Sequence, residues 1–196
     1  MDRPAKRIIV ISAPSGGGKS VVANYILQNF RNVCFSISST TRKMREGEVD
    51  GVHYYFLDRA EFEKKISNDE FVEYEEIFGN YYGTLRTEVE KAFAANQVLL
   101  FDIDVKGAYS IKEHYNEESL LIFLKPPSIE ILTERLQNRK TETAEQIKNR
   151  IARAELEIAM SNDFDFIITN SILEDTLSEI NKAISCTHNG CALLVR

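Results

Sequence analysis

Residues Ile8 to Ser20 read IIVISAPSGGGKS, and no other stretch constrains the fold of this chain as strongly. An apolar run typical of a buried strand leads into three glycines, a lysine and a serine, and a segment with helical periodicity follows. Strand, glycine-rich turn and helix form the beginning of a parallel α/β unit, because such a helix packs back over the sheet that the strand enters. The sequence therefore predicts an α/β fold whose first strand ends at this turn.

The same turn fits the phosphate-binding pattern G-x-x-x-x-G-K-[ST], with alanine at the first glycine position. Polyphosphates need backbone N–H groups at close range, and glycines adopt the dihedral angles that expose these groups. The helix adds the positive end of its dipole, the lysine adds a cation, and the serine offers a hydroxyl to a magnesium ion. A flexible turn that happens to precede a lysine is the alternative, which the flanking strand and helix disfavour. The predicted phosphate-binding residues are Ala13, Pro14, Ser15, Gly16, Gly17, Gly18, Lys19 and Ser20.

Length and charge narrow the class of protein. A chain of 196 residues suits one domain with a small insertion. Its net charge of −6 argues against nucleic acid or an anionic membrane as a partner, because both attract basic surfaces. The three cysteines have no C-x-x-C spacing, and the first apolar run is too short for a signal peptide. We therefore expect a cytoplasmic protein with free thiols, either a monomer or a homodimer.

Strand and helix patterns alternate along the rest of the chain. Strands are expected at 8–12, 33–38, 71–77 with a hairpin partner at 81–82, 98–103, 120–124 and 166–169. Helices are expected at 19–30, 58–66, 87–96, 143–158 and 171–185, with caps at Asp58, Thr87–Glu90, Thr143–Gln146 and Ser171–Glu174. This order predicts a parallel core with an inserted mixed segment at about 36–82. Ligands should bind beyond the carboxyl ends of the core strands.

A second anion site is predicted between residues 38 and 55. Arg42 and Arg45 stand three residues apart and can present their planar guanidinium groups to one phosphate, whose oxygens match that fork. Tyr54 and Tyr82 offer hydroxyl donors to the same group. Two separate anion sites on one chain indicate a protein that brings two phosphorylated ligands together.

Residues 38–55, together with FVEY, GNYYGT and LLFDIDVKG further on, resemble the guanylate kinase family over nearly the whole chain. Met44 departs from the family, which often has proline there. The resemblance implies a P-loop nucleoside-monophosphate kinase fold, in which helices flank a parallel core made of 1–35, 83–125 and 161–196. It also implies a mixed α/β GMP-binding insertion at 36–82 and a helical lid region at 126–160. The implied reaction is phosphoryl transfer from ATP to GMP with Mg²⁺ as cofactor.

The resemblance also implies roles for individual residues. A carboxylate accepts the adjacent N1–H and N2–H donors of guanine but faces an acceptor in adenine, so it selects GMP over AMP. From the residues alone, a solvated strand position is favoured for Glu73, and a solvated helix surface is favoured for the arginines of the lid. The implied GMP-binding residues are Ser38, Arg42, Arg45, Tyr54, Glu73, Tyr82, Thr84 and Asp104. The implied catalytic residues are Lys19, Arg45, Arg139 and Arg150. The resemblance adds Arg135 to the ATP site, and Asn170 is assigned to it from its position at the end of the last strand. Ser20 binds Mg²⁺ with Asp102 in its outer shell.

Three alternatives remain at this stage. A P-loop GTPase is suggested by the D-x-x-G pattern at Asp104–Gly107, but no N-K-x-D motif follows, and Asn181–Lys182 lies within a predicted helix. Another small-molecule kinase would not need Glu73 together with Ser38. A non-catalytic guanylate-kinase-like module that binds proteins would not need the lysine and serine of the turn or the arginines of the lid.

Overall fold

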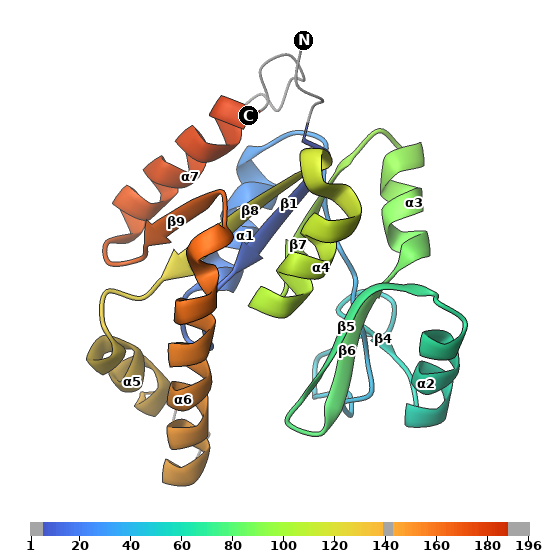
Figure 1. Ribbon diagram of the computed structural model, residues 1–196, viewed down its shortest axis with the longest axis horizontal. Coiled ribbons are helices and arrows are strands. Elements are labelled where there is room, and N and C mark those ends of the chain that lie inside the picture. Colours follow the sequence, from blue (N-terminus) through green and yellow to red (C-terminus); the bar gives the residue numbers. More distant parts are fainter. Residues whose placement is uncertain (1–5, 139–142, 188–196) are drawn as a thin grey trace.

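The computed structural model describes residues 6–138 and 143–187, and a five-stranded parallel sheet forms its centre (Figure 1). The strand order is β2-β7-β1-β8-β9, and every pair in it is parallel. The strands are β1 (Ile8–Ser12), β2 (Val33–Phe35), β7 (Val98–Asp102), β8 (Ser119–Lys125) and β9 (Phe166–Thr169). Because β1 lies in the middle, its carboxyl end meets those of β7 and β8 at the centre of one sheet edge.

Helices cover both faces of this sheet, as the side chains of β1 require. Ile9 and Ile11 pack into one hydrophobic core with α1 and α7, whereas Ile8 and Val10 pack into a second core with α3 and α4. All four side chains are completely buried, which is typical of a parallel strand between two helical layers. These helices are α1 (Lys19–Asn29), α3 (Arg86–Ala94), α4 (Val105–Tyr115) and α7 (Leu173–Thr187). The predicted α/β core is confirmed.

The inserted segment forms a second sheet of four strands in the order β4-β3-β6-β5. Its strands are β3 (Ser39–Thr40), β4 (Tyr55–Phe56), β5 (Phe71–Ile77) and β6 (Asn80–Leu85), and α2 (Arg59–Ser67) covers it. The Phe62 ring of α2 stacks on Phe71 at 4.3 Å and on Tyr81 at 5.1 Å between ring centroids. The predicted hairpin of β5 and β6 is confirmed, and its second strand extends beyond the predicted 81–82 to Leu85.

Two further helices lie on the other side of the carboxyl edge, facing the second sheet across the molecule (Figure 1). They are α5 (Ile129–Gln137) and α6 (Ala144–Met160), and short 3-10 turns η1 (Asn116–Glu118) and η2 (Ser161–Asp163) precede β8 and β9. Leu132 and Leu136 of α5 pack against Ala154 of α6. Of the described residues, no helix is long and apolar enough to cross a membrane.

Helix starts show where local patterns succeed and fail. Asp58 and Thr143 each cap a helix as predicted, and both form full capping boxes. The box predicted at Thr87 is wrong, because α3 begins at Arg86 with Leu85 as its N-cap. The Arg86 side chain donates to the Asp69 carbonyl at 2.8 Å, which holds the helix start beside the turn that precedes β5. The helix predicted from Ser171 begins at Leu173, and β2 ends at Phe35, short of the predicted residue 38.

Candidate active site

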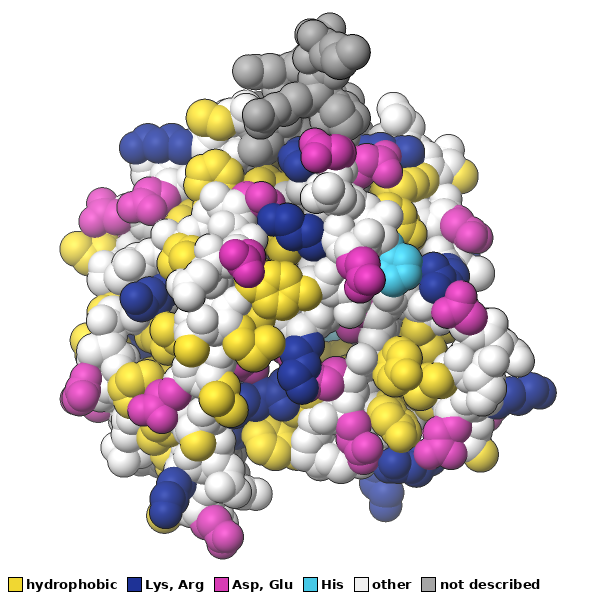
Figure 2. All heavy atoms as spheres, viewed as in Figure 1, with side chains coloured by type: hydrophobic (Ala, Val, Ile, Leu, Met, Phe, Trp, Pro, Cys, Tyr) yellow, Lys and Arg dark blue, Asp and Glu magenta, His cyan; other side chains and the backbone are white. Residues whose placement is uncertain are grey.

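A cavity of about 420 Å³ opens at the carboxyl edge of the core sheet. Its walls come from the glycine turn, the second sheet, the end of β7 and α6. Figure 2 shows basic and acidic side chains meeting around the hollow between α6 and the second sheet. The predicted site residues that line it are Ala13, Ser15, Lys19, Ser38, Arg42, Arg45, Tyr54, Glu73, Tyr82, Asp102, Asp104 and Arg150. The structure therefore gathers both predicted anion sites in one cavity.

The glycine turn supplies backbone where other helices have a capping side chain. Gly18 is the N-cap of α1, and its φ of 93° favours glycine. In contrast, α2, α4, α5 and α6 each begin at an Asp, Ser or Thr side chain that accepts a hydrogen bond from the first turn. An anion can serve as the cap of α1, because the first N–H groups of a helix point out along its axis. Pro14, Gly16 and Gly17 complete the turn without lining the cavity.

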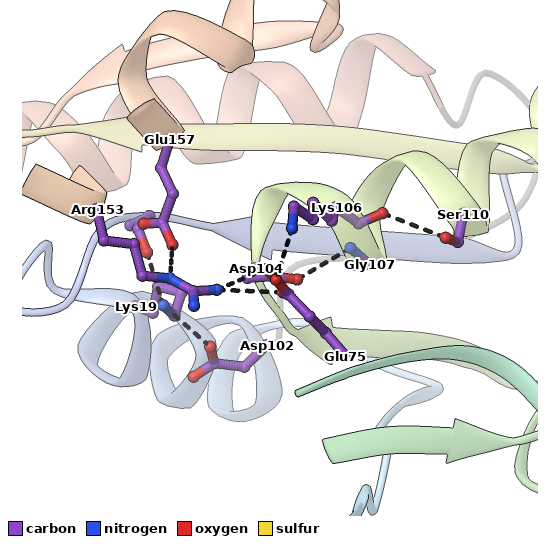
Figure 3. Close-up of polar contacts among 10 residues, drawn as sticks. Lys19, Glu75, Asp102, Asp104, Lys106, Gly107, Ser110, Arg153 and Glu157 are labelled. Carbon is purple, nitrogen blue, oxygen red and sulfur yellow. Dashed lines mark hydrogen bonds and ion pairs between the residues drawn. The ribbon is translucent and has the colours of Figure 1, made fainter. Parts of the chain in front are cut away.

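The side chain of Lys19, at the N-terminus of α1, lies across the glycine turn. Its Nζ donates to the Ala13 carbonyl at 2.7 Å and lies 3.8 Å from Asp102 Oδ1 (Figure 3). Burial raises the pKa of the Asp102 carboxyl, and the charge of Lys19 counteracts part of that shift. The lysine is thus held by the turn itself, with its ammonium group on the wall of the cavity.

Oxygen ligands for a cation are few at this point. Ser20 is the second residue of α1, and Asp102 ends β7. Within residues 6–138 and 143–187, no group of three or more His, Cys, Asp or Glu side chains is arranged to hold a metal ion. This arrangement suits Mg²⁺ that arrives with a nucleotide, because Mg²⁺ keeps waters and phosphate oxygens and takes only one or two protein ligands.

Arg42 reaches a carboxylate that sequence analysis missed. Its two terminal nitrogens donate to Glu48 Oε2 at 3.0 Å and Oε1 at 2.8 Å, and the Arg45 backbone N–H donates to Glu48 Oε2 at 2.7 Å. The hydrogen bonds from Arg42 lower the pKa of the Glu48 carboxyl to about 2. Arg42 also lies 5.2 Å from the Tyr54 ring centroid. Glu48 thereby holds the guanidinium fork of Arg42 at the cavity wall.

The predicted base-reading carboxylate is buried. Glu73 is 6% exposed, which excludes the alternative of a solvated strand position. Burial raises the pKa of the Glu73 carboxyl to about 7, and the negative charge of Asp104 adds to the shift, while the Thr84 hydroxyl opposes it. Thr84 faces Glu73 across the β5–β6 pair. A side chain on Gly107 would bring its Cβ within 2.9 Å of Glu73 Oε2, so the Glu73 carboxylate would have to shift if another residue stood there.

Asp104 stands between the base-reading carboxylate and α6. Its Oδ1 accepts a hydrogen bond from the Gly107 N–H at 2.9 Å, so Asp104 is the N-cap of α4. This cap explains the D-x-x-G pattern in structural terms. Burial raises the pKa of the Asp104 carboxyl to about 7, and its hydrogen bond with Glu75 adds to the shift. Glu75 also lines the cavity, together with Arg153 and Glu157, and none of these three was predicted.

The lid arginines occupy different places. The Arg150 side chain of α6 donates to the Ser15 hydroxyl of the glycine turn. Arg135 of α5 donates to the Asn170 carbonyl at 3.1 Å, outside the cavity lining. The Asn170 side chain donates to the Gly17 carbonyl at 2.8 Å and so supports the turn from behind. Arg139 lies outside the described residues.

Comparisons with known proteins agree with this geometry. The chain matches the family model described as guanylate kinase over residues 5–187. It is 49% identical to the guanylate kinase of Chlorobium chlorochromatii over 92% of this chain and 95% of that protein. It is 46% identical to the guanylate kinase of Bacteroides fragilis over 91% of this chain and 88% of that protein. The crystal structure of guanylate kinase from Anaplasma phagocytophilum matches with a TM-score of 0.77 at 34% identity, covering 98% of this chain and 92% of that chain.

Proposed function

The chain belongs to the guanylate kinase family, and we propose that its cavity transfers the γ-phosphoryl group of ATP to GMP, giving ADP and GDP. One observation carries the assignment to this cavity. A phosphate-binding turn with Lys19 and a buried carboxylate suited to guanine, Glu73, line the same enclosed space. A non-catalytic protein-binding module would have no use for that combination, and the relatives above are guanylate kinases by name.

The donor nucleotide binds at the glycine turn. The backbone of residues 13–18 and the start of α1 surround its phosphates, and Lys19 offers a cation to the oxygens that carry charge in the transition state. Asn170 and Arg135 support this half, because Asn170 holds the Gly17 carbonyl and Arg135 holds the backbone of Asn170. We assign both to the ATP side, Arg135 from the family resemblance and Asn170 from its position at the end of β9.

The acceptor nucleotide binds at the second sheet. Arg42, Arg45, Tyr54 and Tyr82 surround its phosphate, and Glu73 accepts the N1–H and N2–H of guanine, with Ser38, Thr84 and Asp104 beside it. Ionised Glu73 has two acceptor oxygens for two adjacent donors. AMP is rejected because the buried carboxylate would face the N1 acceptor of adenine without a proton between them.

The reaction needs positioning more than proton transfer. An oxygen of the GMP phosphate is already anionic at neutral pH, so it attacks the γ-phosphorus in line without a general base. Arg150 reaches the glycine turn from α6 and stabilises the transferring group, together with Lys19 and Arg45. We also assign Arg139 to this group from the family resemblance alone. Closure of the lid region at 126–160 excludes water that would otherwise hydrolyse ATP.

Mg²⁺ fits the donor half. Ser20 would hold the ion through its hydroxyl, with the Asp102 carboxylate in the outer shell, where a cation would favour the ionised form that burial disfavours. Bound there, Mg²⁺ neutralises phosphate charge and fixes the orientation of the polyphosphate.

The cellular setting follows from the substrates and the surface charge. Both nucleotides are cytoplasmic metabolites, and the net charge of −6 gives no basic surface for nucleic acid or an anionic membrane. We therefore place the enzyme in the cytoplasm as a monomer or homodimer.

A coupled assay tests the proposal directly. Purified chain with ATP, Mg²⁺ and GMP should form ADP at a rate proportional to enzyme, and the same mixture with AMP should react far more slowly. Absence of ADP formation with GMP would contradict the assignment and would favour a module that only binds. Equal rates with GMP and AMP would remove Glu73 from its assigned role.

A further inference from the structure

Arg153 of α6 joins three separate parts of the molecule through one guanidinium group (Figure 3). Its Nη2 donates to Asp104 Oδ2 at 2.9 Å and to Glu75 Oε2 at 3.1 Å, while its Nε donates to Glu157 Oε1 at 2.8 Å. Asp104 is the N-cap of α4 just after β7, Glu75 belongs to β5 of the second sheet, and Glu157 belongs to α6 itself. Arg153 is not among the residues assigned above to the ATP site or the GMP site.

The charges around Arg153 explain why it is needed there. Glu73, Glu75, Asp104 and Glu157 all line the cavity on this side. Lys106 also pairs with Glu75 at 3.0 Å, but its side chain is 66% exposed, whereas that of Arg153 is 27% exposed. A partly buried cation offsets neighbouring carboxylates far more strongly than a solvated one, because water screens the latter. Arg153 is therefore the main balancing charge beside the base-reading carboxylate.

Both oxygens of Asp104 have fixed partners, and Arg153 is one of them. Oδ1 accepts from the Gly107 N–H as the cap of α4, and Oδ2 accepts from Arg153. Without the arginine, the cap and the hydrogen bond with Glu75 would remain, but no cation would bind Oδ2 of Asp104. The position of Asp104 next to the guanine site thus depends on a residue from the lid region.

The same helix also reaches the donor half. Arg150 precedes Arg153 by three residues, so the two side chains lie on one face of α6. Arg150 donates to Ser15 of the glycine turn, while Arg153 binds the acceptor side. Both arginines also lie over the Phe78 ring at the tip of the β5–β6 hairpin, at 5.6 and 6.0 Å from its centroid. One face of α6 therefore spans the two nucleotide sites.

We propose that Arg153 is a positioning residue for the acceptor nucleotide: it holds Asp104 and Glu75 beside the guanine site and ties that site to the helix that places Arg150 on the phosphate turn. This rests on the proposed function. The arginine acts through the two carboxylates and does not touch the reacting atoms. Its loss should therefore weaken the use of GMP more than the use of ATP.

Steady-state kinetics of Arg153→Met test this, because methionine keeps an apolar stem and removes the charge. The KM for GMP should rise about tenfold or more, as expected when a partner of a buried charge pair is removed, while the KM for ATP stays within about twofold. Arg153→Lys should fall between wild type and Arg153→Met, since an ammonium group keeps the charge but lacks the fork. Lys148→Met is the matched control on the exposed side of α6 and should match wild type.

A double-mutant cycle shows whether Arg153 acts through Asp104. In an Asp104→Asn background, adding Arg153→Met should raise the KM for GMP by less than about threefold, because the partner charge is already gone. The same fold-change as in the wild-type background, or an unchanged KM for GMP in Arg153→Met, would overturn the inference. If Arg153→Met does not fold, the KM for GMP of Arg153→Lys is measured in the wild-type and Asp104→Asn backgrounds instead. An unchanged KM, or the same fold-change in both backgrounds, would then overturn the inference. A wild-type chain that forms no ADP with GMP would instead refute the proposed function.

Discussion

The two halves of the cavity hold anionic ligands by different means. The donor half is built from one contiguous segment, 8–20, in which backbone groups and a single lysine face the ligand. The acceptor half is built from side chains that come from distant segments, including Arg42, Glu73, Asp104 and Arg153. Burial raises the pKa values of two of its carboxyls, Glu73 and Asp104, so its function depends on a balance of charges. Backbone recognition is local and robust, whereas side-chain recognition depends on the whole fold.

The largest effect should come from Lys19, the cation that the glycine turn places in the donor half. Lys19→Met should lower kcat by about two to three orders of magnitude, because a preorganised charge that stabilises the transition state is removed. The KM for GMP should change little. Initial rates at saturating ATP and GMP measure this, with Lys148→Met as the control for loss of a lysine. A kcat within tenfold of wild type would break the contrast between the halves.

Substitutions in the acceptor half should change the KM for GMP. Glu73→Gln replaces one of the two acceptor oxygens by an NH₂ group, which faces the donors of guanine. The KM for GMP should rise about a hundredfold and the preference for GMP over AMP should narrow, because a buried hydrogen-bond set is left unpaired. Rates over a range of GMP and AMP concentrations measure both. Unchanged selectivity would show that another group reads the base.

The raised pKa of Glu73 predicts a pH dependence for the acceptor half. Its carboxyl has a pKa of about 7 in the folded protein and must be ionised to accept both guanine donors. The affinity for guanine is therefore present above this pKa and is lost as pH falls through it. Between pH 6 and pH 8 the affinity should increase about tenfold, following the ionised fraction.

Calorimetric titration with guanosine measures this dependence, since guanosine has no phosphate that titrates in the same range. In Glu73→Gln the dependence should be weaker than in wild type, and the part that remains should come from Asp104, whose carboxyl also has a pKa of about 7. A wild-type affinity that is constant from pH 6 to pH 8, or one that falls as pH rises, would contradict the assignment.

The smallest effect should come from removing a side chain that supports the glycine turn without lining the cavity. Asn170→Ala removes the donor to the Gly17 carbonyl and should raise the KM for ATP about fivefold, corresponding to one hydrogen bond of about 1 kcal/mol. The KM for GMP should stay unchanged. If the KM for GMP rose more than the KM for ATP, the two halves of the cavity would not depend on separate sets of residues.

The same contrast explains which features were predictable from sequence. The donor half lies in one stretch, so Ile8–Ser12, the glycine turn and α1 followed from local pattern. The buried strands at 98–102 and 119–125 were also legible, because each is a continuous apolar run. No helix was predicted at 105–115, where Gly107 interrupts the helical pattern, and 129–137 was expected to be helical only as part of the lid region that the resemblance implies.

In the acceptor half, the phosphate site at Arg42 and Arg45 was predicted from the residues themselves, whereas the base-reading residues were predicted only through family resemblance. Glu73 is one of several acidic residues in its strand, and burial singles it out only once β5 packs against α4. Glu48 and Arg153 were missed, because their partners are set by tertiary contacts. The R-x-x-R-x-x-E spacing of Arg42, Arg45 and Glu48 was the available signal for the former. For Arg153, it was the three-residue spacing from Arg150.

The central claim is that one cavity holds both nucleotides at the same time, with their phosphates facing each other. Calorimetry with a bisubstrate in which adenosine and guanosine are joined by five phosphates tests it most directly. The account predicts one molecule bound per chain, tighter than either nucleotide alone and competitive with both ATP and GMP. Binding of two molecules per chain, or competition with only one of the nucleotides, would contradict it.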